Sequence, residues 1–186
     1  MKLKGFTMET ARLFLRRWNK EDAENLYILF NDNEVSSACG LKPHNSVNYS
    51  RHIISDYFSQ EPFTYLIELK MLQIPIGMIS LKTKEHSNLV NQDDELELSF
   101  WLGKKYWGQK IIIEAGTFLL KYAFKQLKKR QIWAKIYAGN DRAWKTLKNL
   151  GFKYQYTRKS VELPMLEERR DEHIFLLNAQ NFIYKI

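Results

Sequence analysis

The segment from Glu95 to Phe152 constrains the fold most, because strand and helix patterns alternate along it. Residues 95–102 alternate with period two, so one face should lie in the core: Leu96, Leu98, Phe100 and Leu102. The opposite face holds Glu95, Glu97, Ser99 and Trp101. After a turn at 103–109, apolar residues recur at helical spacing as far as Leu127. A strand at 131–138 and a short helix after Asn140 complete the order strand, helix, strand, helix.

Weaker patterns of the same kind fill the rest of the chain. Further strands are expected at 11–18, 63–69, 74–81, 153–163 and 172–179. Further helices are expected after Asn19 and from about residue 46 to 59. Polar or Gly/Pro-punctuated stretches at 31–43, 82–94 and 164–171 are expected to be loops. These patterns predict a single α+β domain over residues 1–186, with a central, mostly antiparallel mixed sheet of about seven strands and about four helices.

Composition restricts the compartment and the class of protein. A hydrophobic content of 45% over 186 residues is enough for a core. Cys39 is the single cysteine, which excludes an intramolecular disulfide, and four scattered histidines show no metal-ligand spacing. No apolar run approaches the ~20 residues that span a bilayer, and the first ten residues lack the core of a signal peptide. We therefore expect a cytoplasmic protein without a metal and without a membrane partner.

The charge predicts an anionic partner. A net charge of +8 fits nucleic acid, a phosphorylated cofactor or an acidic protein equally well. The sequence has no helix-turn-helix, zinc-finger or aromatic RNA-binding signature, so nucleic acid is not expected to be the main ligand. Nothing in the sequence indicates the oligomeric state.

Short motifs occur in a characteristic order along nearly the whole chain. They are Glu9-Thr10-Ala11-Arg12-Leu13 with Leu15-Arg16, Glu21-Asp22-Ala23, Ile76-Gly77, Glu97-Leu98-Ser99-Phe100-Trp101-Leu102, Tyr106-Trp107-Gly108, Glu114-Ala115, Asn140 and Leu150-Gly151-Phe152. This order resembles the GNAT superfamily of acyl-CoA-dependent N-acetyltransferases, most closely its ribosomal-protein N-terminal acetyltransferase branch. The resemblance implies a GNAT-like fold and an enzyme that uses acetyl-CoA as its acyl donor and no metal. It also implies direct transfer, in a ternary complex, to a primary amine such as a protein N-terminus.

The resemblance also implies where acetyl-CoA lies. In the family the strand matching 97–102 diverges from the strand matching 132–138, and the pantetheine arm occupies the gap. The pyrophosphate sits at the N-terminus of the following helix, where free N–H groups and the helix dipole bind anions. The implied cofactor-binding residues are Phe100, Trp101, Leu102, Gly108, Gln109, Lys110, Ile111, Ile112 and Asn140. Core packing of the aromatic residues, and an N-cap role for Asn140, are alternative interpretations.

The pyrophosphate loop departs from the pattern of the branch. Members usually show Gly-x-Gly-x-Gly/Ala, whereas Lys110 and Ile112 stand at the second and third small positions of this chain. Lys110 offers a charge in place of close approach, whereas the bulk of Ile112 would crowd the site. This departure keeps open a second hypothesis, a non-catalytic GNAT-fold protein that binds an acyl-CoA or another protein.

Catalysis requires a base for the amine and a proton for the thiolate. Glu97 is the candidate catalytic base because it matches the family's strand carboxylate; the alternative is that Glu95 and Glu97 only face solvent on the outer side of a strand. The family often supplies a Ser or Tyr as the acid, but the matching positions are Ala143 and Leu147. This leaves Tyr137, a water, or departure of the thiolate without an acid. Cys39 is expected to be a spectator. Glu114 is expected to be structural, since a carboxylate in a first helical turn interacts well with the dipole.

Overall fold

An eight-stranded sheet forms the centre of the computed structural model, which describes residues 7–182. The strand order is β1-β2-β3-β4-β5-β6-β8-β7, and β5 with β6 is the one parallel pair among the described strands. The strands are β1 (Met8–Glu9), β2 (Leu13–Arg17), β3 (Thr64–Leu69), β4 (Ile74–Lys82), β5 (Glu95–Leu102), β6 (Gln131–Tyr137), β7 (Lys153–Leu163) and β8 (Glu168–Asn178). The predicted α+β class and the mostly antiparallel mixed sheet are confirmed.

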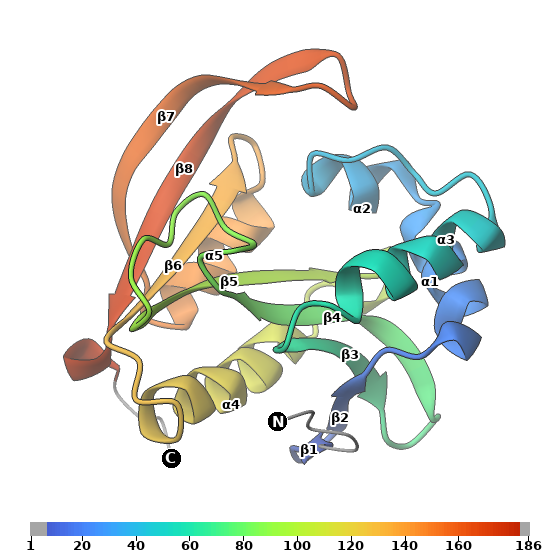
Figure 1. Ribbon diagram of the computed structural model, residues 1–186, viewed down its shortest axis with the longest axis horizontal. Helices are drawn as coiled ribbons and strands as arrows, with labels where there is room; N and C mark the ends of the chain where they lie inside the picture. Colours follow the sequence, from blue (N-terminus) through green and yellow to red (C-terminus); the bar gives the residue numbers. More distant parts are fainter. Residues whose placement is uncertain (1–6, 183–186) are drawn as a thin grey trace.

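Helices cover both faces of this sheet (Figure 1). The α-helices among the described residues are α1 (Ala23–Phe30), α2 (Asn33–Ala38), α3 (Val47–Ile53), α4 (Ile111–Lys125) and α5 (Asp141–Asn149). Single-turn helices occupy Lys20–Asp22, Lys104–Tyr106 and Ala179–Asn181, and the π-helix Ile54–Phe58 extends α3. Figure 1 shows α4 on one side of the sheet and α1, α2 and α3 on the other.

Each face of the sheet therefore has an apolar cluster. Leu96, Leu98 and Leu102 of β5 pack with α4 in the larger cluster, as the alternation predicts. On the opposite face Trp101 packs against α1, with its ring centroid 5.1 Å from that of Phe30, in agreement with the core-packing interpretation of this residue. The reason is that α1 to α3 bury a second apolar surface. Alternate residues of β5 therefore face two different cores, and neither face is open to solvent.

Three boundaries differ from the sequence-based expectation. Residues 31–43 contain α2, because Asp32 caps it by accepting from the amides of Glu34 (2.8 Å) and Val35 (3.2 Å). β8 begins at Glu168 instead of residue 172, since its charged first residues pair across the hairpin with β7 and leave only a short turn. The two-residue β1 adds an eighth strand. The polar character of these segments hid α2, β1 and the first residues of β8 from a prediction based on apolar patterns. Capping and cross-strand pairing stabilise polar segments as well as apolar ones.

The parallel pairing between β5 and β6 stops halfway along both strands. Their register runs from Glu95 opposite Gln131 to Leu98 opposite Ala134. Beyond that point β5 continues to Leu102 beside β4 alone, and β6 continues to Tyr137 beside β8 alone. The two strands thus diverge at their carboxyl ends, as the family resemblance implies.

His44 is buried under α3 and links folding to pH. Its ring is 6% exposed, packs 4.8 Å from the ring of Phe30, and its Nδ1 lies 2.7 Å from the Ser50 hydroxyl. Burial lowers the pKa of His44 from its ordinary value of 6.5 to about 4. The unfolded chain therefore binds a proton at this residue between those two pH values while the folded chain does not.

We predict that this difference makes stability fall as the pH drops from about 6.5 to about 4. The stabilisation is fully present above the unfolded pKa and is lost as the pH falls through the folded one. In His44→Gln the decline across this window should be shallower than in wild type, as measured by urea denaturation at a series of pH values. His52→Gln, at an exposed position of α3, is the control and should follow wild type. Identical pH dependence in all three proteins would show that His44 does not contribute.

Candidate functional site

A cavity of about 380 Å³ opens between the carboxyl half of β5, the N-terminus of α4 and the face of α5. Its volume lies in the range of small-molecule sites in proteins. All nine residues that the resemblance implies as cofactor-binding line it: Phe100, Trp101, Leu102, Gly108, Gln109, Lys110, Ile111, Ile112 and Asn140. The divergence of β5 from β6 and this cavity thus lie at the same end of the two strands.

The N-terminus of α4 presents its amide groups without a side-chain cap. Lys110 is the N-cap residue, and its side chain makes no capping hydrogen bond. Lys110 has φ 58° and Gly108 has φ 75°, so both residues are in the left-handed region. A non-glycine residue there costs about 1 kcal/mol, which explains on physical grounds why a glycine suits this position. The loop nevertheless keeps its turn and leaves an anion-binding helix end facing the cavity.

Ile112 does not crowd this loop, which corrects the expectation from the sequence. The side chain is only 6% exposed and packs in the large apolar cluster that includes Ala115 and Leu119 of α4. Its bulk is therefore accommodated in the core beneath the helix, although the residue also lines the cavity. The replacement of a small residue at this position changes core packing more than the shape of the loop.

Cations from separate elements surround the cavity. Lys110 comes from the loop, and Arg142 and Lys145 come from α5. The guanidinium carbon of Arg142 lies 3.8 Å from the ring centroid of Trp107, whose indole N–H donates to the Leu102 carbonyl (2.9 Å). Sequence reasoning did not assign Arg142, although its position in the first turn of a helix after Asn140 was a usable signal. Positive charge on two walls suits an anionic ligand.

Asn140 combines the two roles that the sequence left open. Its side-chain oxygen accepts from the amide of Ala143 at 3.1 Å, which caps α5, and the residue also lines the cavity. Ala143 and Leu147 are buried on the core side of α5 and carry no ionisable hydrogen. Thr146 lines the cavity, but its hydroxyl donates to the Arg142 carbonyl (2.9 Å).

Glu97 is buried next to the point where β5 and β6 part. The residue is 2% exposed, pairs with Trp133 one position before the last parallel pair, and does not line the cavity described above. The Ser87 hydroxyl donates to its carboxylate, and Ser87 itself accepts from the amide of Leu89 (3.0 Å). Glu95 is also buried, at 7%. The interpretation that these two carboxylates face solvent is therefore wrong, because the 83–94 loop covers them.

Further polar groups surround Glu97 on the same face. Burial raises the pKa of Tyr137, and the nearby charges of Glu172 and Glu97 act in the same direction, so its hydroxyl stays protonated near neutral pH. Glu172 is 2% exposed and pairs with Arg158 (3.4 Å) and Lys135 (3.7 Å). Burial raises the pKa of Cys39 to about 12, so this thiol, which lines the cavity, is not a nucleophile at neutral pH.

Residues 7–182, the described part of the chain, contain no metal-ligand cluster and no helix that could span a membrane. In that range no three His, Cys, Asp or Glu side chains come together in a way that could hold a metal ion. None of the helices there is long and apolar enough to cross a membrane.

Comparison with known proteins assigns the chain to a family. The sequence model of the acetyltransferase (GNAT) domain matches residues 12–153. The chain belongs to the GNAT acetyltransferase family. GNAT acetyltransferases take their acetyl group from acetyl-CoA, and this protein is accordingly an acyl-CoA-dependent N-acetyltransferase.

Individual GNAT proteins resemble it over most of their length. The uncharacterized N-acetyltransferase p20 of Bacillus licheniformis is 28% identical over 165 residues, which cover 84% of this chain and 87% of that protein. A GNAT-family acetyltransferase from Bacillus anthracis superimposes with a TM-score of 0.81 at 19% identity, covering 94% of this chain and 99% of the other.

Two further solved structures share the fold. The ribosomal-protein-S5-alanine acetyltransferase of Vibrio fischeri has a TM-score of 0.72 at 17% identity, with 96% and 100% coverage of this chain and that chain. The microcin C7 self-immunity acetyltransferase, solved in complex with acetyl-CoA and AMP, has a TM-score of 0.74 at 19% identity, with 90% and 93% coverage. These likenesses show the GNAT fold.

The core position of Ile112 yields a stability prediction. Ile112→Ala should lower the free energy of unfolding by about 2–5 kcal/mol, because it removes buried methyl groups and leaves a cavity. Ile113→Ala is the matched control, since the neighbouring residue also lines the cavity but is only half-buried and should lose less. Chemical denaturation of both variants gives the comparison. Equal losses would mean that Ile112 is no more a core residue than Ile113.

Proposed function

We propose that the protein transfers an acetyl group from acetyl-CoA directly to a primary amine, within a ternary complex. The observation that carries this proposal is the juxtaposition of three features: the divergence of β5 from β6, the cavity at that divergence, and the uncapped N-terminus of α4. A strand edge without a neighbour needs a hydrogen-bonding partner, and an uncapped helix end attracts an anion. Acetyl-CoA has an amide-containing arm and a pyrophosphate, and it meets both requirements.

The residues that would hold the donor come from three elements. The unpaired edge of β5 from Phe100 to Leu102 would pair with the pantetheine arm. Asn140, at the N-terminus of α5, lines the same cavity. The amides from Gln109 to Ile112 would bind the pyrophosphate, with the Lys110 ammonium nearby. The microcin C7 self-immunity acetyltransferase, which shares the fold, was solved in complex with acetyl-CoA and AMP, which supports acetyl-CoA as the donor.

The thioester supplies an activated acetyl group, and the chain must manage protons on either side of the transfer. A neutral amine attacks the carbonyl carbon, so a C–N bond forms while the C–S bond breaks. Glu97 is the proposed base that takes the ammonium proton, because it is a buried carboxylate at the closed end of the divergence. Tyr137 keeps its proton near neutral pH and is the proposed donor to the sulfur in place of the missing Ser or Tyr on α5.

The proposed acceptor is the α-amine of a protein or peptide. The motif order of the ribosomal-protein branch and the fold shared with a ribosomal-protein-S5-alanine acetyltransferase support this choice. The net charge of +8 favours a neutral or acidic peptide over a polycationic aminoglycoside, which the field of the protein would repel.

The direct test combines binding with turnover. Calorimetry at low salt should detect CoA, and acetyl-CoA with a panel of peptides should release thiol faster than acetyl-CoA with aminoglycosides. A folded protein that gives no response to millimolar CoA would contradict the proposed donor site. Faster acetylation of an aminoglycoside than of every peptide would overturn only the acceptor.

Replacing the proposed base gives a second prediction. Glu97→Gln should lower kcat by about 100-fold or more, because the amide keeps the shape but cannot accept a proton. CoA affinity should remain near that of wild type, since Glu97 does not line the donor cavity.

Glu95→Gln is the matched control, because Glu95 lies on the same strand and face and is also buried. This variant should retain turnover. A pH–rate profile of Glu97→Gln that coincides with that of wild type would remove Glu97 from the catalytic role.

A further inference from the structure

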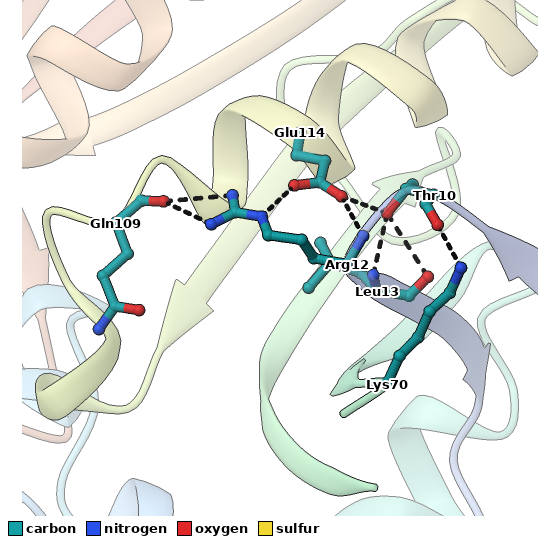
Figure 2. Close-up of polar contacts among 6 residues, drawn as sticks. All are labelled: Thr10, Arg12, Leu13, Lys70, Gln109 and Glu114. Carbon is teal, nitrogen blue, oxygen red and sulfur yellow. Dashed lines mark hydrogen bonds and ion pairs between the residues drawn. The ribbon is translucent and has the colours of Figure 1, made fainter. Parts of the chain in front are cut away.

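A polar network joins the turn between β1 and β2 to the loop before α4 (Figure 2). Glu114, in the first turn of α4, accepts from the Thr10 hydroxyl (2.6 Å), the Arg12 amide (2.8 Å) and Nε of Arg12 (2.6 Å). The two terminal nitrogens of Arg12 both donate to the carbonyl of Gln109, each at 3.2 Å. Lys70 in turn donates to the Thr10 carbonyl. The network is therefore anchored in the sheet and ends on the backbone of the cavity wall.

Glu114 is held as a carboxylate in this network. Burial acts to raise the pKa of Glu114, but the hydrogen bonds from Thr10 and Arg12 outweigh it and hold that pKa below its usual value. Besides the expected structural role at the helix N-terminus, Glu114 therefore holds the Arg12 side chain in place. Its fixed charge pairs with Nε of Arg12 and orients the planar guanidinium toward Gln109.

The orientation of one peptide unit then follows from its geometry. In a planar trans peptide the carbonyl and the next amide N–H point in opposite directions. The Gln109 carbonyl faces Arg12, so the N–H of Lys110 faces away from Arg12. Gln109 and Lys110 line the cavity, whereas Arg12 does not.

Backbone strain at Lys110 favours rotation of the Gln109–Lys110 peptide. Lys110 has φ 58°, a conformation that costs a residue with a side chain about 1 kcal/mol. Rotation of the Gln109–Lys110 peptide would move Lys110 out of the left-handed region. The same rotation would direct the Gln109 carbonyl oxygen toward the cavity, where it would repel an anion. The two Arg12 hydrogen bonds oppose this rotation.

We propose that Arg12 is a positioning residue for acyl-CoA: its guanidinium, oriented by Glu114, holds the Gln109–Lys110 peptide with its N–H toward the pyrophosphate. This inference rests on the proposed function. Arg12 does not touch the ligand, so its effect should appear with every donor that carries a pyrophosphate and with no donor that lacks one.

Three donors separate positioning from other roles. Acetyl-CoA carries the pyrophosphate and the 3′-phosphate, acetyl-dephospho-CoA carries the pyrophosphate alone, and acetyl-pantetheine carries neither. Arg12→Lys, which keeps the charge but loses the planar fork, should lower kcat/KM about tenfold for the first two donors, through KM. For acetyl-pantetheine it should match wild type within about twofold.

A matched arginine elsewhere provides the control. Arg130 uses its Nε to pair with Asp94 at 2.8 Å, in the same side-on manner, and it does not line the cavity. Arg130→Lys should leave all three donors unchanged. Glu114→Gln is the second variant, and it should reproduce the donor discrimination of Arg12→Lys if Arg12→Lys proves too unstable to assay.

Each result has one meaning. Equal losses for all three donors would show a general structural role and overturn the proposal, as would full activity of Arg12→Lys. A loss with acetyl-CoA alone would indicate a direct contact to the 3′-phosphate and would also overturn it. Wild-type protein that turns over none of the donors would instead refute the proposed function, which keeps the two failures distinguishable.

Discussion

The incomplete pairing of β5 with β6 is the constraint on which the rest of the site depends. Parallel neighbours require a crossover connection, and here α4 provides it. The N-terminus of α4 follows the carboxyl end of β5, and the N-terminus of α5 follows the carboxyl end of β6. The strands separate at these same ends, so the cavity, the uncapped start of α4 and Asn140 converge there. If β5 and β6 were paired along their whole length, the two strands would lie side by side and leave no space for the cavity.

Two apolar cores, one on each face of the sheet, pack around that opening. The cluster under α4 supports the loop and accommodates Ile112, while the cluster under α1 to α3 encloses Trp101. The polar groups beside the divergence are buried by another segment, the 83–94 loop, which donates from Ser87 to Glu97 and from the amide of Asn91 to Glu95. Glu97 and Glu172 are both buried, and each carboxylate has a specific protein partner, Ser87 for Glu97 and Arg158 for Glu172.

Long-range polar contacts set the fine geometry of the donor loop. Arg12 and Gln109 are separated by 97 residues, yet two hydrogen bonds from Arg12 determine which way a peptide of the cavity wall faces. Lys110 occupies a conformation that a glycine would adopt at little cost. The loop thus keeps the backbone shape of an anion site although two small residues of the family pattern are absent, because the strain is local and Arg12, in the turn between β1 and β2, anchors the loop.

Sequence periodicity and capping determined the element order, the limits of β5 and β7, the cap at Asn140 and the motifs that identify the family. Those signals are local, since a strand alternation or an N-cap depends on residues within a few positions of each other. Motif order also named nine residues of the cavity wall, although it did not assign Arg142. Only the tertiary structure decided that both faces of β5 are buried, that Ile112 belongs to the core, and that Arg12 reaches Glu114 across 102 residues of chain. Burial and side-chain pairing depend on which elements pack together, and no pattern along a single segment specifies its neighbours in space.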